Sequence, residues 1–271
     1  MTLVMGVVNV TPDSFSDGGR HLREDDAVAH GEALRVDGAD ILDIGGESTR
    51  PGAPRVDASV EQERVLPVIA RLAAAGAMLS VDTMNAATAV AAVAAGARIV
   101  NDVSGGLADP DMLAAVAGTD ADIILQHWRG HSAAMYEPAH YADIAAEVIG
   151  ELQQRVQAAT DAGIPAERII LDPGFGFGKQ PADNWVLARD LPRLVGLGFR
   201  VLVGTSRKRM LAVATGDDAT EEAKDLATAV TSVLAAQAGA WGVRVHDVAA
   251  TRIALAVRDE LEGRGCPTES R

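Results

Sequence analysis

Residues 78–100 read MLSVDTMNAATAVAAVAAGARIV and contain one complete structural repeat. The short apolar run 78–81 predicts a buried strand, and the alanine-rich stretch 85–95 predicts a helix. Gly96 follows at the place where glycine commonly adopts the left-handed conformation that ends a helix. A second apolar run, 99–100, comes next. Strands buried on both faces are continuously apolar, and parallel neighbours need a crossover helix, so this stretch predicts a β-α-β unit with parallel strands.

The same pattern recurs along the chain and predicts eight strand-helix units. The expected strands are 4–8, 41–44, 78–81, 99–100, 123–125, 169–171, 201–203 and 243–245. The expected helices are 25–37, 60–75, 85–95, 110–117, 141–162, 184–197, 222–238 and 249–261.

Eight units in 271 residues favour one α/β domain, a closed (β/α)8 TIM barrel. An open doubly wound sheet is the alternative, but no glycine fingerprint follows the first strand. We expect the barrel to occupy residues 1–262 and residues 263–271 to form a disordered tail.

The composition limits which classes of partner and which cellular compartment we expect for this protein. The formal net charge of −14 repels nucleic acid and anionic lipid surfaces, so we expect neither as a partner. Apolar runs are too short to span a membrane, and no basic region precedes the first apolar run, which predicts a cytoplasmic protein. The single cysteine, Cys266, offers neither a disulfide nor a thiolate metal site. An anionic substrate would need a local cluster of cations.

Polar residues follow the predicted strands at nearly every position. They are Asn9, Gly45-Gly46-Glu47, Asp82, Asn101-Asp102, His127, Asp172, Ser206-Arg207-Lys208 and Arg244-Val245-His246-Asp247. One such residue alone is weak evidence, because an aspartate after a strand often caps the next helix, as Asp82 could. A barrel brings all eight strand ends around one mouth, which favours a functional site there.

Several of these motifs resemble dihydropteroate synthases. The stretches MGVVNVTPDSFSDGG (5–19) and DIGGESTRPG (43–52) are similar to the two signature loops of that family. The resemblance continues through VDT (81–83), NDVSGG (101–106), LDPGFGFGK (171–179), GTSRK (204–208) and RVHDV (244–248), and covers nearly the whole chain.

The resemblance implies a transferase of folate biosynthesis. Such an enzyme joins 6-hydroxymethyl-7,8-dihydropterin diphosphate to p-aminobenzoate, with Mg²⁺ assisting the departing diphosphate, and yields 7,8-dihydropteroate. It also implies inhibition by sulfonamides and a homodimer, which we expect to form through the late helices 222–238 and 249–261.

The resemblance implies a role for each of several residues. Asp82, Lys208 and Asn9 are the expected catalytic residues. The pterin ring would contact Asp82, Asn101, Asp172 and Lys208. The diphosphate would contact Asn9, Arg244 and His246, and Asn9 would bind Mg²⁺. The p-aminobenzoate pocket and its loops would include Phe15, Thr49, Arg50, Pro51, Phe177, Ser206 and Arg209.

Competing interpretations remain for some positions. Asp172 could be a turn residue before Pro173, Lys208 a solvated helix-start lysine, and His246 a core histidine. Gln126 stands near where the family often has methionine. Arg209 either grips the p-aminobenzoate carboxylate or is a solvated charge.

Two other functions compete with the synthase. A pterin-binding methyltransferase acting on methyltetrahydrofolate would also recognise the pterin edge through aspartate and asparagine, but it would not need the diphosphate cations. A non-catalytic paralogue would bind pterin without forming product.

Overall fold

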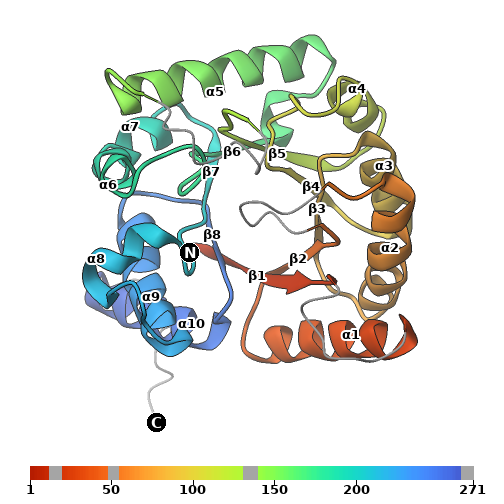
Figure 1. Cartoon of the computed structure of the whole chain (residues 1–271), viewed down its shortest axis with the longest axis horizontal. Helices are drawn as coiled ribbons and strands as arrows, with labels where there is room; N and C mark the ends of the chain where they lie inside the picture. Colours follow the sequence, from red (N-terminus) through yellow and green to blue (C-terminus); the bar gives the residue numbers. More distant parts are fainter. Residues whose placement is uncertain (12–19, 48–54, 131–139, 264–271) are drawn as a thin grey trace.

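Eight parallel strands close on themselves in chain order, each paired with the next and β8 with β1. The computed structural model describes residues 1–11, 20–47, 55–130 and 140–263 (Figure 1). The strands are β1 (Leu3–Asn9), β2 (Ile41–Gly45), β3 (Leu79–Asp82), β4 (Ile99–Asp102), β5 (Asp122–Gln126), β6 (Ile169–Asp172), β7 (Arg200–Val203) and β8 (Gly242–Val245). The predicted barrel and all eight predicted strands are confirmed. The division between a barrel of residues 1–262 and a tail stays a prediction, because residues 264–271 lie outside the described ranges.

Helices surround the barrel on its outer side (Figure 1). They are α1 (Arg20–Val36), α2 (Ala58–Ala74), α3 (Ala86–Ala95), α4 (Met112–Ala117), α5 (Ile144–Asp161), α6 (Pro181–Arg189), α7 (Leu191–Val195), α8 (Ala212–Thr215), α9 (Glu221–Gln237) and α10 (Val248–Leu261), with 3-10 turns η2 (Ala166–Arg168) and η3 (Arg209–Leu211). None of the described helices is long and apolar enough to cross a membrane.

The helix predicted over 184–197 is wrong in one respect, since two helices occupy this stretch. α6 ends at Arg189, and α7 begins at Leu191 with Pro192 in its first turn. Proline lacks an N–H donor and its ring clashes with the preceding turn, so it suits the start of a helix and not its interior. The short helices after β7, η3 and α8, were not predicted.

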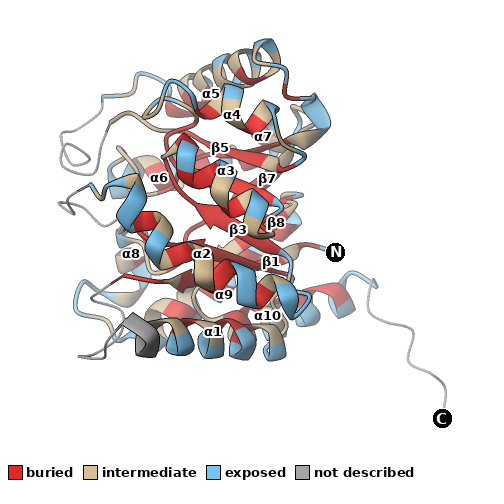
Figure 2. Ribbon diagram, turned by 90° about the vertical axis from the view of Figure 1, so that its right-hand side faces the viewer, coloured by how far each residue is buried: buried red, intermediate tan, exposed pale blue. Residues whose placement is uncertain are grey.

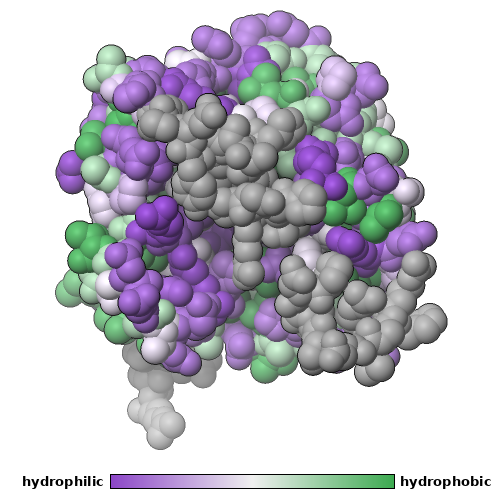
Figure 3. All heavy atoms as spheres, viewed as in Figure 1, coloured by the Kyte–Doolittle hydropathy of each residue, from purple (hydrophilic) through white to green (hydrophobic). Residues whose placement is uncertain are grey.

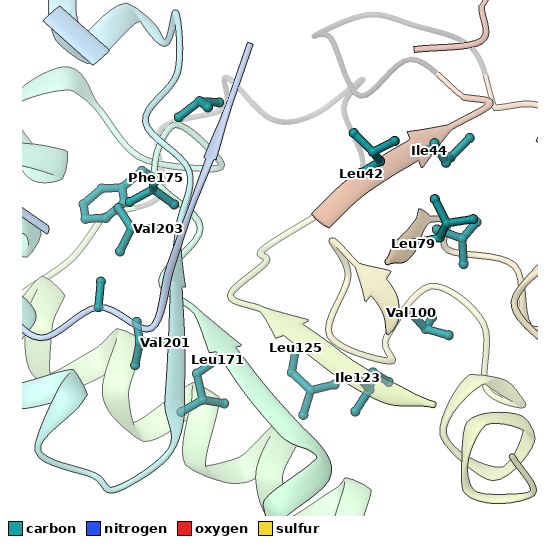
Figure 4. Packing of buried hydrophobic residues seen from close by; sticks show 14 of the residues in the cluster. Leu42, Ile44, Leu79, Val100, Ile123, Leu125, Leu171, Phe175, Val201 and Val203 are labelled. Carbon is teal, nitrogen blue, oxygen red and sulfur yellow. The ribbon is translucent and has the colours of Figure 1, made fainter. Parts of the chain in front are cut away.

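Apolar side chains form two separate layers because strand residues alternate between the two faces of the sheet. The outer layer packs the strands against the helices and includes the labelled residues of Figure 4, among them Leu42, Val100 and Leu171. The inner layer fills the barrel toward the N-terminal ends of the strands and comprises Met5, Ile41, Ile99, Ile124, Ile170 and Leu202. Figure 2 shows the buried residues along the strands and on the inner sides of the helices.

Candidate functional site

A polar layer lies directly above the inner apolar layer, toward the C-terminal ends of the strands. Asp43, Asn101 and Asp172 each stand two residues after an inner-layer isoleucine, Ile41, Ile99 and Ile170, so they face the same side of the sheet. Asp82 and Arg244 occupy matching inward positions on β3 and β8. The loops after the strands continue this face, where hydrophilic residues cover much of the described surface (Figure 3).

Arg244 joins two carboxylates across the mouth of the barrel. Its Nε donates to Asp43 Oδ2 at 2.6 Å, and its Nη2 donates to Asp82 Oδ2 at 2.8 Å. Asn101 Nδ2 also donates to Asp43 Oδ2, at 3.0 Å. Asp43, Asp82 and Asn101 are buried. Burial raises the pKa of Asp82 to about 7, even though the Arg244 guanidinium acts in the opposite direction.

The helix-capping interpretation of Asp82 is wrong. The helix after β3 begins at Ala86, and the backbone N–H of Ala86 donates to Asp109 Oδ2 at 2.8 Å. The Asp82 side chain instead faces Arg244 across the barrel. It is therefore available to the site.

Asp172 combines the turn role with a place in the mouth. Its Oδ1 accepts a hydrogen bond of 2.6 Å from the backbone N–H of Gly174. Its Oδ2 lies near Gly204. A Cβ built on Gly204 would stand 3.9 Å from Asp172 Oδ2 and 3.9 Å from Lys208 Nζ. Burial raises the pKa of Asp172, against the Lys208 ammonium and the Gly174 N–H. One oxygen thus shapes the turn while the other faces a cation.

Lys208 lies over the loop after β6. Its Nζ donates to the backbone oxygen of Phe175 and stands 4.6 Å from the centroid of the Phe177 ring. Burial lowers the pKa of Lys208 to about 8, with Asp172 opposing this shift. Gly176 has a φ of +77°, which favours glycine, and a Cβ there would approach the Lys208 stem to 2.9 Å, so a side chain at this position would strain the backbone and displace Lys208. The solvated-lysine interpretation does not describe this side chain.

Arg207 was expected to belong to a cluster of cations after β7, but its side chain pairs with carboxylates of α9. Its guanidinium donates to Asp225 on α9 at 2.8 and 2.7 Å and pairs with Glu221, outside the barrel mouth. Its φ of +57° turns the chain between Ser206 and Lys208. Its charge therefore holds α9 and is not directed at the mouth.

Ser206 and His246 meet beside the mouth. Ser206 Oγ lies 2.8 Å from His246 Nδ1 and accepts a hydrogen bond from the His246 backbone N–H at 3.1 Å. His246 is half-buried, which argues against a core histidine. Arg209 begins η3 and is exposed. Phe15, Thr49, Arg50 and Pro51 lie outside the described residues.

Asn9 stands beside Asp82 across a strand glycine. A Cβ on Gly45 would lie 3.7 Å from Asn9 Oδ1 and 3.9 Å from Asp82 Oδ2, so both oxygens border the space that this glycine leaves open. No group of three or more His, Cys, Asp or Glu side chains in the described ranges could hold a metal ion alone. Oxygen donors of this kind fit Mg²⁺, which keeps several waters and is often shared with substrate phosphates.

A partly buried network supports the loop after β6, and the sequence did not indicate it. Lys179 Nζ donates to the backbone oxygens of Gly174 and Phe177 at 2.9 and 3.1 Å, and lies 2.9 Å from His127 Nδ1. A lysine ammonium can only donate, so Nδ1 accepts and the His127 proton is on Nε2, which donates to Glu151 at 2.9 Å. His127, expected among the converging strand-end groups, therefore supports the loop that carries Phe175 and Phe177.

Because His127 is neutral in the folded protein, we expect it to make the stability of the protein depend on pH. Burial, with the nearby Lys179 charge, lowers the pKa of His127 to about 4, whereas an unfolded histidine titrates near 6.5. As the pH falls from about 6.5 to about 4, the unfolded state protonates this histidine first, and we expect the contribution of His127 to the free energy of unfolding to fall by roughly 3 kcal/mol. Urea unfolding of the wild type and His127→Gln across this range measures the effect.

The glutamine variant keeps a donor and an acceptor but cannot take up a proton, so its stability should depend less on pH. His30→Gln, at an exposed histidine of α1, should retain the wild-type dependence. Equal pH dependence in the wild type and His127→Gln would contradict this assignment.

The chain is similar to pterin-binding enzymes both in sequence and in structure. A family model described as pterin binding enzyme matches residues 5–246. The dihydropteroate synthase of Mycobacterium leprae is 51% identical over 259 residues, which cover 94% of this chain and 91% of that protein. The structure of Xanthomonas albilineans dihydropteroate synthase with 4-aminobenzoic acid has a TM-score of 0.89 and 50% identity, covering 96% of this chain and 93% of that one. A complex of dihydropteroate synthase from X. albilineans with 7,8-dihydropteroate has a TM-score of 0.85 and 44% identity, with the same coverage.

Proposed function

Because this chain belongs to the family of pterin-binding enzymes, we infer that it catalyses the dihydropteroate synthase reaction. It condenses 6-hydroxymethyl-7,8-dihydropterin diphosphate with p-aminobenzoate and releases diphosphate. The observation that carries this function is the layer of Asp82, Asn101 and Asp172, with Lys208 and Arg244, at the mouth of a barrel of this family. This layer offers acceptors to a donor-bearing heterocycle and cations to an anion.

We assign the pterin ring to Asp82, Asn101, Asp172 and Lys208. The ring presents a guanidine-like edge with several N–H donors, and buried carboxylate and amide oxygens are suited to accept from it. Asp172 Oδ2, which is not used by the Gly174 turn, supports its role as the main anchor. Lys208 beside it balances the carboxylate charge.

We assign the diphosphate to Asn9, Arg244 and His246. The sequence predicted a cluster of positive charge here, but the charge of Arg244 is balanced by Asp43 and Asp82. Arg207 is paired with Asp225 on α9 and does not add its charge to this site. The described side chains alone thus provide little excess positive charge for a diphosphate. This supports a need for Mg²⁺, which we place at Asn9 and which, when bound, would neutralise charge on the leaving group.

The reaction needs no protein nucleophile. The p-aminobenzoate nitrogen forms a bond to the pterin methylene carbon, the bond from that carbon to the diphosphate oxygen breaks, and the electron pair leaves with diphosphate. The attacking nitrogen, now bonded to the pterin methylene carbon, then loses one proton to solvent. Asp82 stabilises positive charge that develops on the pterin, and Lys208 with Phe177 borders the p-aminobenzoate side of the ring.

The p-aminobenzoate site is assigned to Phe177, Ser206 and Arg209, together with residues of the first two loops that lie outside the described ranges. A sulfonamide that resembles p-aminobenzoate is expected to compete for the same place. The cytoplasmic location stays a prediction.

The decisive test measures both products. Purified protein is incubated with pterin diphosphate and Mg²⁺, with and without p-aminobenzoate, while diphosphate is assayed and dihydropteroate is detected by mass. Diphosphate and dihydropteroate appearing together, only with both substrates and not after chelation of Mg²⁺, support the synthase and its metal. Pterin binding without either product in folded protein would favour the non-catalytic paralogue, and methyl transfer from methyltetrahydrofolate would favour the methyltransferase.

We also propose that two copies associate through α9 and α10, which pack against each other. Each helix exposes three large apolar side chains at a spacing of four residues, so each forms one stripe. The residues are Leu226, Val230 and Leu234 on α9, and Ile253, Val257 and Leu261 on α10, all at least 54% exposed.

If the homodimer forms through these two helices, charged substitutions on them should lower the molar mass of the protein in solution. Val230→Asp with Val257→Asp should shift the protein from dimer to monomer in light scattering, because each charge would be buried without a partner in the interface. Val90→Asp, an exposed valine on α3, is the matched control and should remain dimeric. A wild type that is monomeric at all concentrations tested would exclude this interface.

A further inference from the structure

Asp43 is a buried carboxylate within β2, and the roles assigned above do not include it. It is 0% exposed and faces the barrel interior, in register with Ser80 on β3. A carboxylate in such a place is unfavourable unless donors compensate its charge. Its contacts therefore indicate what it does.

Both donors to Asp43 converge on one oxygen. Arg244 Nε and Asn101 Nδ2 lie 2.6 and 3.0 Å from Oδ2. Within the described ranges Oδ1 has no hydrogen-bond partner. Asp43 thus acts on the mouth through one oxygen that links β4 to β8.

The Asp43 carboxylate determines which end of the Asn101 amide faces it. An ionised carboxylate only accepts hydrogen bonds, so the Asn101 NH₂ must face Asp43, and a flipped amide would oppose two acceptors. Asn101 Oδ1, an acceptor, is then the end turned from Asp43. The same carboxylate fixes the Arg244 guanidinium at Nε, while Asp82 holds it at Nη2.

We propose that Asp43 is a positioning residue for pterin recognition: it orients the Asn101 amide and the Arg244 guanidinium so that Asn101 presents an acceptor to an N–H donor of the ring. This inference rests on the proposed function, because it assumes that the ring binds at this layer. Asp43 acts through its two partners and does not itself contact the ring.

Asp43→Asn tests the proposal, because an asparagine can donate as well as accept and so permits either orientation of Asn101. We expect the Kd of 6-hydroxymethyl-7,8-dihydropterin diphosphate, measured by calorimetry without p-aminobenzoate, to rise about tenfold. In turnover, the KM for the pterin diphosphate should rise similarly, while the KM for p-aminobenzoate should stay within about twofold.

A double-mutant cycle separates positioning from a general loss of structure. If Asp43 acts through Asn101, then Asp43→Asn should add less than about threefold to the Kd of Asn101→Ala, instead of the full tenfold. Ser80→Ala changes the neighbouring buried position in the same layer and should leave the Kd unchanged. If Asp43→Asn does not fold, Asp43→Ser, which removes the carboxylate without adding an amide, replaces it in the same cycle.

The outcomes are distinct. A wild type that does not bind the pterin diphosphate overturns the proposed function itself. A wild type that binds it, with fully additive effects of Asp43→Asn and Asn101→Ala or equal losses for both substrates, overturns only the role of Asp43.

Discussion

Asp82→Asn is expected to lower kcat for dihydropteroate formation by about 10²- to 10³-fold, a larger factor than its effect on the Kd of the pterin diphosphate. Asparagine has nearly the same shape and still offers an oxygen to Arg244 Nη2, 2.8 Å away in the wild type. It lacks the negative charge that stabilises a developing pterin cation. Steady-state kinetics and calorimetry on the same preparation measure both quantities.

The pH profile provides a second check on Asp82. Burial raises its pKa to about 7, and the ionised form is the active one, so kcat should fall as the pH decreases through about 7. Asp82→Asn should lack this step. Asp122→Asn breaks an Asp–Arg pair of 2.8 Å at the start of β5, at the opposite end of the barrel, and should retain both rate and profile. A kcat of Asp82→Asn within fivefold of the wild type would exclude the electrostatic role.

Asp172→Asn is expected to weaken pterin diphosphate binding by about 100-fold. One oxygen of residue 172 must accept from the Gly174 N–H, at 2.6 Å in the wild type. An asparagine that keeps this bond turns its NH₂ toward the N–H donors of the pterin edge, so donor faces donor. Calorimetry without p-aminobenzoate measures this loss.

The Asp172 prediction differs from that for Asp82 in the step that it affects. At saturating pterin diphosphate, kcat of Asp172→Asn should recover to a larger fraction of the wild-type value than kcat of Asp82→Asn. A Kd within threefold of the wild type would mean that Asp172 serves only the turn, which is the competing interpretation of this residue.

Local sequence predicted the elements of the fold because their signals are local. The alternation of apolar runs, helical stretches and terminal glycines is written in each unit, and Gly96, with φ +121°, ends α3 as expected. The break between α6 and α7 carried a local signal too, in Pro192. Strand-end residues such as Asp82 and Asp172 could be placed at the mouth because a closed barrel brings the strand ends together.

Two consecutive residues show the limit of this reasoning. Arg207 and Lys208 are both cations after β7, yet Lys208 lies over Phe177 and Arg207 pairs with Asp225. The difference depends on the left-handed backbone at Arg207 and on where α9 packs. Neither follows from the identity of the side chains.

The sequence by itself determined the barrel, the family and the ring of polar strand ends, because each depends on short-range patterns and ordered motifs. Only the tertiary structure decided how those polar groups are paired. The Arg244–Asp43 contact joins residues 201 positions apart, and it forms because closure of the barrel sets β8 beside β1 and in reach of β2. Asp43 lies inside a strand, where only the register of the closed sheet shows which side chains share its layer.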